Sequence, residues 1–468
     1  MRRRSFIRKA GTVALTLSGG ADVFAGISFQ RGPALSIVLR GGRCFYQNRW
    51  QSPDVGIDQA GKLFFGAAGQ LVAPQIISIG NRIISPGFID ILADNATNPQ
   101  RTYKIFEKYK VSDGVTTALQ MHGGSGDCAA YYKMFAAMPH VVNYGVSTAV
   151  MRIRNATNSF SERKRKVEQC LEEGALGVSH SIEYQPTPYE EVLGYARLAK
   201  KYDRPFFLHL RYSSLDKELE GVDEAIRIAK ESGARVHISH LHSTGGTFQM
   251  AGALDRIRNA NALGLVITCC VYPYSYWATY LNSRRFDSGW QQRYKLTYSD
   301  LRLVGTSERL TAQSFSKYRE MKKLVAVPEG TIPLETTVDL ALKEPFCLIG
   351  SDGGIEYEAH ANSHPRGAGC FATALRRGIK LGIEMEILLE KMTLLPRNLM
   401  KPALQDRGLL ANGAWADLTV FDPVTVDGAA TVENPNQFSR GIDLVFVNGK
   451  LAIEKGKLTA TSGVGIHY

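Results

Sequence analysis

Polar side chains follow short apolar segments along the middle of the chain. His122 follows GVTTALQM, His209 lies within PFFLHLR, His240 lies within VHISHLH, and Asp352 follows CLIGS. Imidazole nitrogens and carboxylate oxygens are donors that zinc prefers, and an open coordination position lets a water molecule bind. Water held in this way becomes a nucleophile at neutral pH. These residue types therefore predict a metal-dependent hydrolytic site.

The elements that must position these residues alternate along the chain. Helical patterns at residues 190–205, 222–233 and 252–264 are each followed by one of the apolar segments. Repeated helix-then-strand units predict a parallel sheet. Their extent over roughly 300 residues favours a β/α (TIM-like) barrel over a doubly wound sheet, in which we expect a Gly-rich phosphate loop. In a barrel the carboxyl ends of the strands meet at one face, so the polar residues should converge there.

Two β-rich segments flank the middle of the chain. Residues 33–83 and 403–468 contain short apolar stretches separated by Gly, Asn and Asp, which predict small antiparallel strands. The Asn-Gly pair at 448–449 predicts a tight hairpin. We therefore expect one small β-sandwich built from both chain ends and an α/β barrel domain over residues 84–402. The charged segment at about 281–333 interrupts the alternation and is interpreted as an insertion over one strand end.

The first thirty residues predict export. Arg3 and Arg4 open the run RRSFI, a mildly apolar stretch follows, and the small-residue sequence VFA ends at Ala25. The pattern resembles a bacterial twin-arginine signal followed by a cleavage site, which predicts a periplasmic protein. The alternative interpretation is a disordered basic N-terminus.

Composition excludes several classes of protein. The 468 residues are 44% hydrophobic, which is typical of a globular protein with a large core. The seven cysteines are odd in number and form no CxxC pair, which argues against a disulfide framework and a zinc ribbon. The net charge of +12 is not gathered into a basic stripe with aromatic residues, so no nucleic-acid partner is expected. No apolar run reaches the ~18 residues of a membrane span.

The order of the motifs resembles a known family. SPGFID, DGVTTAL, GALGVS, FLHLR, HISHLH, IGSDG, HPRGAG, GAWADLTVFDP and VFVNGK occur along nearly the whole mature chain. Together they resemble the amidohydrolase superfamily, specifically its D-aminoacylase (N-acyl-D-amino-acid deacylase) branch. The resemblance implies a metal-bearing β/α barrel beside a small β-sandwich made from both termini. It also implies hydrolysis of linear amide C–N bonds in small molecules.

The resemblance carries some site residues over directly. His209 and His240 match the two histidines that hold the family's tightly bound zinc, and Asp352 matches its catalytic aspartate. The family's bridging cysteine is Gly123 here, and we expect the neighbouring His122 to point to the same place.

The pattern for a second metal is missing. Leu92 and Asp94 stand where the family has a His-x-His pair, in the stretch PGFIDILADN. Leu92 cannot bind a metal, whereas Asp94 offers carboxylate oxygens. The sequence therefore predicts one zinc ion per chain, with His122 or Asp94 completing the site.

Further residues near the strand ends are candidates for substrate contacts. Arg366 is expected to bind a substrate carboxylate bidentately. Arg211, Tyr272 and Tyr274 are candidates too; the alternative is a rim ion pair for Arg211 and packing around Pro273 for the tyrosines. Glu183 is either a metal ligand or a residue of the barrel rim, and we favour the rim.

Two functional hypotheses remain. The first is a metal-dependent amide hydrolase in which Asp352 moves the proton. The alternative is a catalytically silent relative that binds a small molecule, which the missing ligands at Leu92 and Gly123 favour. The retention of His209, His240 and Asp352 favours the enzyme.

Overall fold

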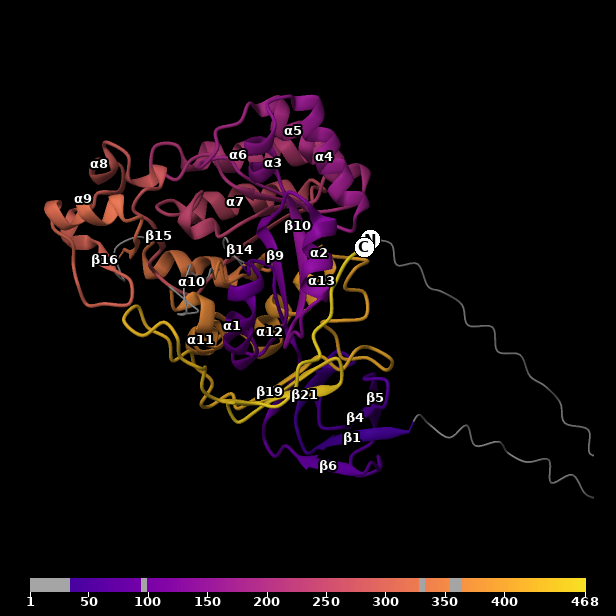
Figure 1. Ribbon diagram of the computed structural model, residues 1–468. Helices are drawn as coiled ribbons and strands as arrows, with labels where there is room; N and C mark the ends of the chain where they lie inside the picture. Colours follow the sequence, from indigo (N-terminus) through magenta and orange to yellow (C-terminus); the bar gives the residue numbers. More distant parts are fainter. Residues whose placement is uncertain (1–33, 94–98, 328–332, 354–363) are drawn as a thin grey trace, which may run out of the picture. The chain divides into compact units, whose positions relative to one another are not determined.

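The computed structural model describes residues 34–93, 99–327, 333–353 and 364–468. The predicted export segment at residues 1–30 and the candidate ligand Asp94 lie outside these ranges. Eight parallel strands form a nearly closed barrel, in the order β18-β14-β13-β12-β11-β10-β9-β8 (Figure 1). The strands are β8 (Phe88–Asp90), β9 (Val115–Ser125), β10 (Asn143–Ala149), β11 (Val178–Ser181), β12 (Phe206–His209), β13 (Val236–Ile238), β14 (Ile267–Val271) and β18 (Cys347–Ile349). The predicted barrel fold is confirmed.

Helices cover the outside of the barrel. They are α1 (Pro99–Ser112), α2 (Cys128–Ala136), α3 (Val150–Ala156), α4 (Phe160–Glu172), α5 (Tyr189–Lys201), α6 (Glu218–Ser232), α7 (Met250–Ala262), α10 (Glu335–Lys343), α11 (Arg366–Lys380), α12 (Met385–Met392) and α13 (Leu394–Leu399). Helix α6 illustrates why the sequence folds in this way. Its buried residues include Val222, Ala225 and Ile228, which share one helical face, and it ends at Gly233, whose φ of 68° suits a left-handed cap.

The two chain ends form the small β-sandwich. One sheet has the order β5-β4-β1-β6 and the other the order β22-β21-β20-β19-β7. The strands are β1 (Leu35–Arg40), β4 (Asp54–Asp58), β5 (Leu63–Gly66), β6 (Gln75–Ser78), β7 (Ile83–Pro86), β19 (Leu418–Phe421), β20 (Ile442–Val447), β21 (Lys450–Glu454) and β22 (Lys457–Leu458). Val55, Ile57, Leu418 and Phe446 belong to one buried cluster that joins residues from both ends of the chain.

Two details of the sandwich bear on the sequence prediction. The Asn448-Gly449 turn joins β20 to β21 with both residues at positive φ, as the hairpin signal predicts. The prediction of antiparallel strands fails for β6, which pairs with β1 in parallel. The segment between β5 and β6 carries the chain back over the sheet, so β6 runs in the same direction as β1.

The segment after β14 has a small core of its own. It contains the sheet β15-β17-β16, of strands β15 (Ala278–Tyr280), β16 (Arg302–Leu303) and β17 (Leu324–Ala326), with helices α8 (Trp290–Tyr294) and α9 (Ala312–Glu320). Trp277, Phe286, Trp290 and Phe315 are buried together in it. The chain returns to the barrel through α10 and β18. None of the described helices is both long and apolar enough to cross a membrane.

Candidate active site

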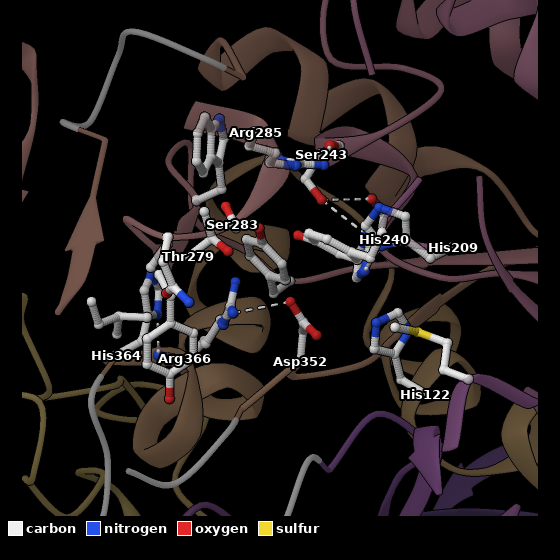
Figure 2. A pocket seen from close by; sticks show the side chains of 18 residues that line it. His122, His209, His240, Ser243, Thr279, Ser283, Arg285, Asp352, His364 and Arg366 are labelled. Carbon is white, nitrogen blue, oxygen red and sulfur yellow. Dashed lines mark hydrogen bonds and ion pairs between the residues drawn. The ribbon is translucent and has the colours of Figure 1, made fainter. Parts of the chain in front are cut away.

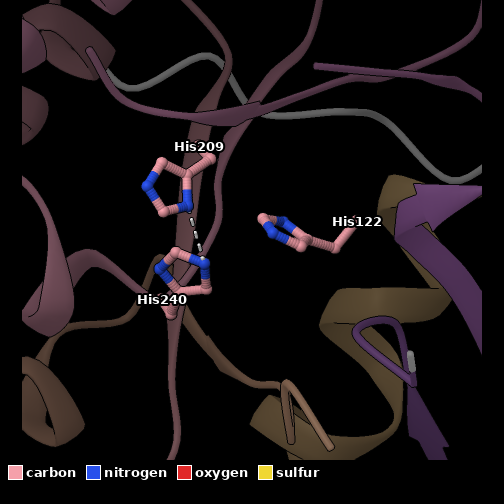
Figure 3. A group of neighbouring side chains, drawn as sticks. All are labelled: His122, His209 and His240. Carbon is pink, nitrogen blue, oxygen red and sulfur yellow. Dashed lines mark hydrogen bonds between the residues drawn. The ribbon is translucent and has the colours of Figure 1, made fainter. Parts of the chain in front are cut away.

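Three histidines from three barrel strands converge at one face (Figure 3). His122 lies in β9, His209 is the last residue of β12, and His240 follows β13 by two residues. One ring nitrogen of each lies within 4.8 Å of the others. His209 Nδ1 and His240 Nε2 are 3.2 Å apart. The three histidines lie together as the sequence predicts, but the expectation that a strand ends at His122 is wrong, because β9 continues to Ser125.

The protonation of His209 and His240 suits metal binding. Burial lowers the pKa of His209 to about 4 and that of His240 well below its usual value. Both rings are therefore neutral at pH 7, which is the form that binds metals. His209 Nε2 lies 2.8 Å from a carboxylate oxygen of Glu183, which only accepts, so His209 donates there and keeps the lone pair on Nδ1.

The surroundings of His240 accommodate the matching tautomer. Its Nδ1 lies 2.9 Å from Ser243 Oγ, and that hydroxyl also lies 3.2 Å from the carbonyl oxygen of His240. When the hydroxyl donates to the carbonyl, His240 donates from Nδ1 and its Nε2 keeps a lone pair.

These lone pairs give the cluster the geometry of a cation site. With both rings in this tautomer, the two lone pairs face each other across 3.2 Å, and a cation between them would bind both. Two nitrogens that each lie ~2.0–2.1 Å from a tetrahedral zinc are about 3.3 Å apart. The described residues therefore fit a metal ion held by His122, His209 and His240.

Glu183 is more than a rim residue, because it contacts His209 directly. Its carboxylate also pairs with Arg285 at 3.1 Å and accepts from the Ser213 hydroxyl. Burial raises the pKa of Glu183, but Arg285 and the hydrogen bonds from His209 and Ser213 more than offset this and lower it to about 2. A carboxylate on the second nitrogen fixes the orientation and basicity of a metal-binding histidine. Glu183 lies two residues after β11, on the rim as expected, and from there its carboxylate holds the ring of His209.

Arg285 links the segment after β14 to this site. It is 4% exposed and donates to the Ser243 carbonyl oxygen at 2.6 Å as well as to Glu183. It therefore contacts both residues that orient the histidines. Sequence reasoning missed Arg285, because the charged segment around it carries no periodic signal.

A cavity of about 400 Å³ opens beside the histidines (Figure 2). Asp352 and Arg366 line it together with the histidines, and Tyr272 also faces it. Asp352 Oδ2 lies 3.0 Å from Arg366 Nη2. The remaining wall is mixed. Aromatic and apolar side chains such as Tyr184, Trp277 and Leu324 alternate there with polar ones such as Thr279, Asn282 and Ser283. The site therefore combines a metal-binding cluster, a carboxylate and a cation around one hollow.

Arg366 has room for a further acceptor. Its guanidinium lies 4.8 Å from the centre of the Tyr272 ring, and its Nε has no hydrogen-bond partner among the described residues. His364 Nε2, on the same wall, is also unpartnered within the described part of the chain. Unpaired buried donors of this kind are the groups that a polar ligand satisfies.

Two of the candidate substrate residues lie elsewhere. Arg211 forms an ion pair with Glu224 of α6 at 2.6 Å and donates to the Thr187 carbonyl oxygen, outside this cavity. This is the rim ion pair that the sequence left open. Tyr274 directs its hydroxyl to Thr373, 3.3 Å away, and does not line the cavity either. Tyr272 and Tyr274 are separated by Pro273 alone, so their positions in the sequence did not distinguish them.

The missing ligands have structural explanations. Leu92 is fully buried in a cluster of the barrel interior with Leu119, Met121 and Phe207. Its side chain therefore packs among apolar neighbours and offers no donor atom. Gly123 belongs to β9 beside His122 and offers no donor side chain.

Comparison with known proteins finds similar chains. The chain is 29% identical over 455 residues to N-acyl-D-glutamate deacylase of Alcaligenes xylosoxydans xylosoxydans, across 85% of this chain and 88% of that protein. It is 25% identical over 449 residues to D-aminoacylase of the same organism, across 85% and 89% of the two chains. No protein-family model matches the chain.

Solved structures share the fold. The structure of N-acyl-D-glutamate deacylase from Bordetella bronchiseptica, complexed with zinc and a phosphonate inhibitor, superposes with a TM-score of 0.78 at 23% identity. It matches 93% of this chain and 100% of its own. D-aminoacylase superposes with a TM-score of 0.76 at 22% identity, over the same shares of the two chains.

The fold and the histidine cluster resemble those of the amidohydrolase class: an eight-stranded barrel with clustered histidines, beside a sandwich made from both chain ends. Within that class the chain is similar to enzymes of the D-aminoacylase branch. The resemblance stated from the sequence motifs is therefore confirmed.

Proposed function

We propose that the protein is a metal-dependent hydrolase of linear amide bonds in N-acyl amino acids, most similar to N-acyl-D-amino-acid deacylases. The observation that supports this most directly is the placement of three metal-competent imidazoles and Asp352 around one cavity. Relatives named as deacylases of N-acyl-D-glutamate and N-acyl-D-aspartate support the substrate class. We further propose one zinc ion per chain, since Leu92 removes a ligand of a second site.

The residues divide the chemistry between them. A divalent cation held by His122, His209 and His240 would polarise the amide carbonyl and acidify the attacking water. Asp352 accepts the proton from that water and returns it to the departing amine, which otherwise leaves as a poor anionic group. Arg366 orients Asp352 through Nη2 and offers Nε to the substrate carboxylate. The mixed aromatic and polar wall of the cavity surrounds the remainder of the substrate.

Catalytically silent binding is the second candidate, favoured by the loss of ligands at Leu92 and Gly123. Metal content and turnover separate the two. Zinc per chain is measured after purification without chelator, and release of free amine is followed for matched N-acetyl-D- and N-acetyl-L-amino acids with acidic and neutral side chains. We expect one equivalent of zinc and turnover that is lost with a chelator and restored by zinc. Full zinc loading with no turnover of any member would contradict the enzyme and support the binding protein.

We also propose that the protein is exported to the periplasm through the segment around Arg3 and Arg4. The support is the sequence pattern alone, and the corresponding experiment is given in the Discussion.

A further inference from the structure

A buried ion pair lies beneath Asp352. Asp90, the last residue of β8, is fully buried, and Lys110 of α1 is 1% exposed. Lys110 Nζ lies 2.7 Å from Asp90 Oδ2. Because two charges in the interior lose their hydration, such a pair adds little stability over apolar packing. A contribution to stability therefore does not explain why Asp90 and Lys110 are paired in the interior.

The Asp90 carboxylate is saturated with donors. Oδ1 accepts from the backbone N–H groups of Leu92 at 3.1 Å and Ser351 at 3.0 Å. Oδ2 accepts from Lys110 Nζ at 2.7 Å and from Ser351 Oγ at 2.5 Å. An ionised carboxylate has about four acceptor positions. All are used, and two of the donors belong to the residue immediately before Asp352.

The Ser351 hydroxyl also uses its donor and acceptor positions within this network. It donates to Asp90 and accepts from Lys110 Nζ at 2.8 Å and from the backbone N–H of Gly353 at 3.0 Å. The network thus holds the residues on both sides of Asp352. Asp352 itself has a φ of 48°, in the left-handed region that non-glycine residues rarely adopt. Such a conformation persists only when its surroundings fix it.

The network also lies at the seam of the barrel. β8 and β18 are the two end strands of the eight-stranded sheet, and an isolated parallel bridge joins Ala93 to Gly353 near them. At this seam the Asp90 side chain bonds the backbone and side chain of Ser351, two residues after β18 ends. One side chain therefore joins the first strand to the eighth at the point where Asp352 enters the cavity.

We propose that Asp90 and Lys110, acting through Ser351, are positioning residues that set the backbone of Asp352 for proton transfer. The proposal rests on the hydrolase function proposed above. The proposal also gives the stretch PGFIDILADN a role in catalysis. This stretch contains β8 and lacks the histidine pair, but its Asp90 holds Asp352, which follows β18, in place.

The first test is Ser351→Ala, which removes one hydroxyl and no charge. Ser179→Ala is the matched control, because Ser179 is a buried barrel serine whose hydroxyl donates to the Thr148 carbonyl oxygen between β10 and β11. A misplacement of about 1 Å costs on the order of 10²-fold in rate. We expect kcat of Ser351→Ala to fall by about that factor with KM and zinc content unchanged, and Ser179→Ala to retain the wild-type kcat. A kcat of Ser351→Ala within twofold of wild type would overturn the proposal.

A second variant addresses the ion pair without leaving a lone buried charge. Asp90→Asn combined with Lys110→Met removes both charges, since removal of one partner alone strongly destabilises a protein. We expect the double variant to fold and bind zinc but to show the loss of kcat seen for Ser351→Ala. A double variant with zinc and the wild-type kcat contradicts the proposal; one that does not fold leaves the decision to Ser351→Ala.

Crystal structures test the positioning of Asp352 independently of whether the protein is a hydrolase. If the wild type hydrolyses no substrate, the proposed function fails, and crystal structures of wild type and Ser351→Ala then decide the positioning. We expect the variant to lose the positive φ of Asp352 or its 3.0 Å contact with Arg366. An unchanged Asp352 in the variant would refute the positioning role irrespective of activity.

Discussion

Replacing Glu183 by glutamine tests whether the carboxylate behind His209 sets the metal affinity of the site. The substitution keeps the length of the side chain and one acceptor oxygen. It removes the negative charge that faces both His209 Nε2 and Arg285, at 2.8 Å and 3.1 Å. The three histidines that would bind the metal remain in place.

The size of the effect follows from burial and pairing. Glu183 is 14% exposed and Arg285 is 4% exposed, so loss of the carboxylate leaves a buried guanidinium without its counter-charge. The pKa of Glu183 is lowered from 4.5 to about 2 by its surroundings, which at 1.36 kcal/mol per pH unit is an interaction of about 3 kcal/mol. Removal of one partner of a buried pair costs ~3–5 kcal/mol. We therefore expect the free energy of unfolding to fall by about 3 kcal/mol and zinc affinity to fall ~10–100-fold.

The assay is zinc competition against a chelator of known affinity at pH 7, with urea unfolding of the metal-free protein. Glu224→Gln is the matched control, because Glu224 pairs with Arg211 at 2.6 Å outside the cavity. We expect it to bind zinc like the wild type. If folded Glu183→Gln binds zinc with an affinity within twofold of wild type, Glu183 does not set the metal affinity through His209.

Three further predictions concern the chemistry, the export and the acid stability of the protein. Asp352→Asn should lower turnover by at least about 10²-fold and keep zinc, whereas His240→Asn should lose both; near-normal turnover of Asp352→Asn would exclude it as the base. Arg3→Lys with Arg4→Lys should retain the protein in the cytoplasm on cell fractionation, and unchanged periplasmic recovery would remove the twin-arginine interpretation. Burial raises the pKa of Asp54, but bonds from Arg40, Gly69 and Leu71 lower it on balance. Because its pKa is lowered on folding, ionised Asp54 stabilises the folded state at any pH above the pKa of the unfolded chain, 3.8. The free energy of unfolding in urea should therefore be higher for wild type than for Asp54→Asn at about pH 5–6, and this difference should shrink as the pH falls below 3.8. A difference that does not change with pH would contradict this.

The sequence was sufficient for the parts of the site that depend on strand order. His209 ends a strand, His240 follows one, and His122 lies near the end of β9; the barrel brings such places together irrespective of the distance between them in the sequence. The alternation of helices and strands predicted that barrel, and the β-rich chain ends predicted the sandwich. Leu92 was already incompatible with a ligand by residue type alone.

Other parts depend on side-chain contacts that no local pattern encodes. Strands β12, β13 and β14 lie between Glu183 and Arg285 in the sequence. The two residues meet because the segment after β14 brings Arg285 against Glu183. Arg211 and Tyr272 both follow strands, but only Tyr272 lines the cavity. Arg211 instead forms an ion pair with Glu224 on α6. The link from Asp90 to Ser351 joins the first strand to the eighth, which a reading of each strand by itself does not detect.

The pairing of β7 with β19 has a consequence for the order of folding. Residues 83–86 lie directly before the first barrel strand, but their partner strand spans residues 418–421. During synthesis, β7 therefore has no partner strand β19 until almost the whole chain has left the ribosome. Such non-local pairing slows folding and leaves strand edges exposed in the meantime. A nascent chain of this topology needs protection from aggregation until β19, at residues 418–421, has been made. A C-terminal truncation that removes β19 would therefore also leave β7, near the start of the chain, without its partner.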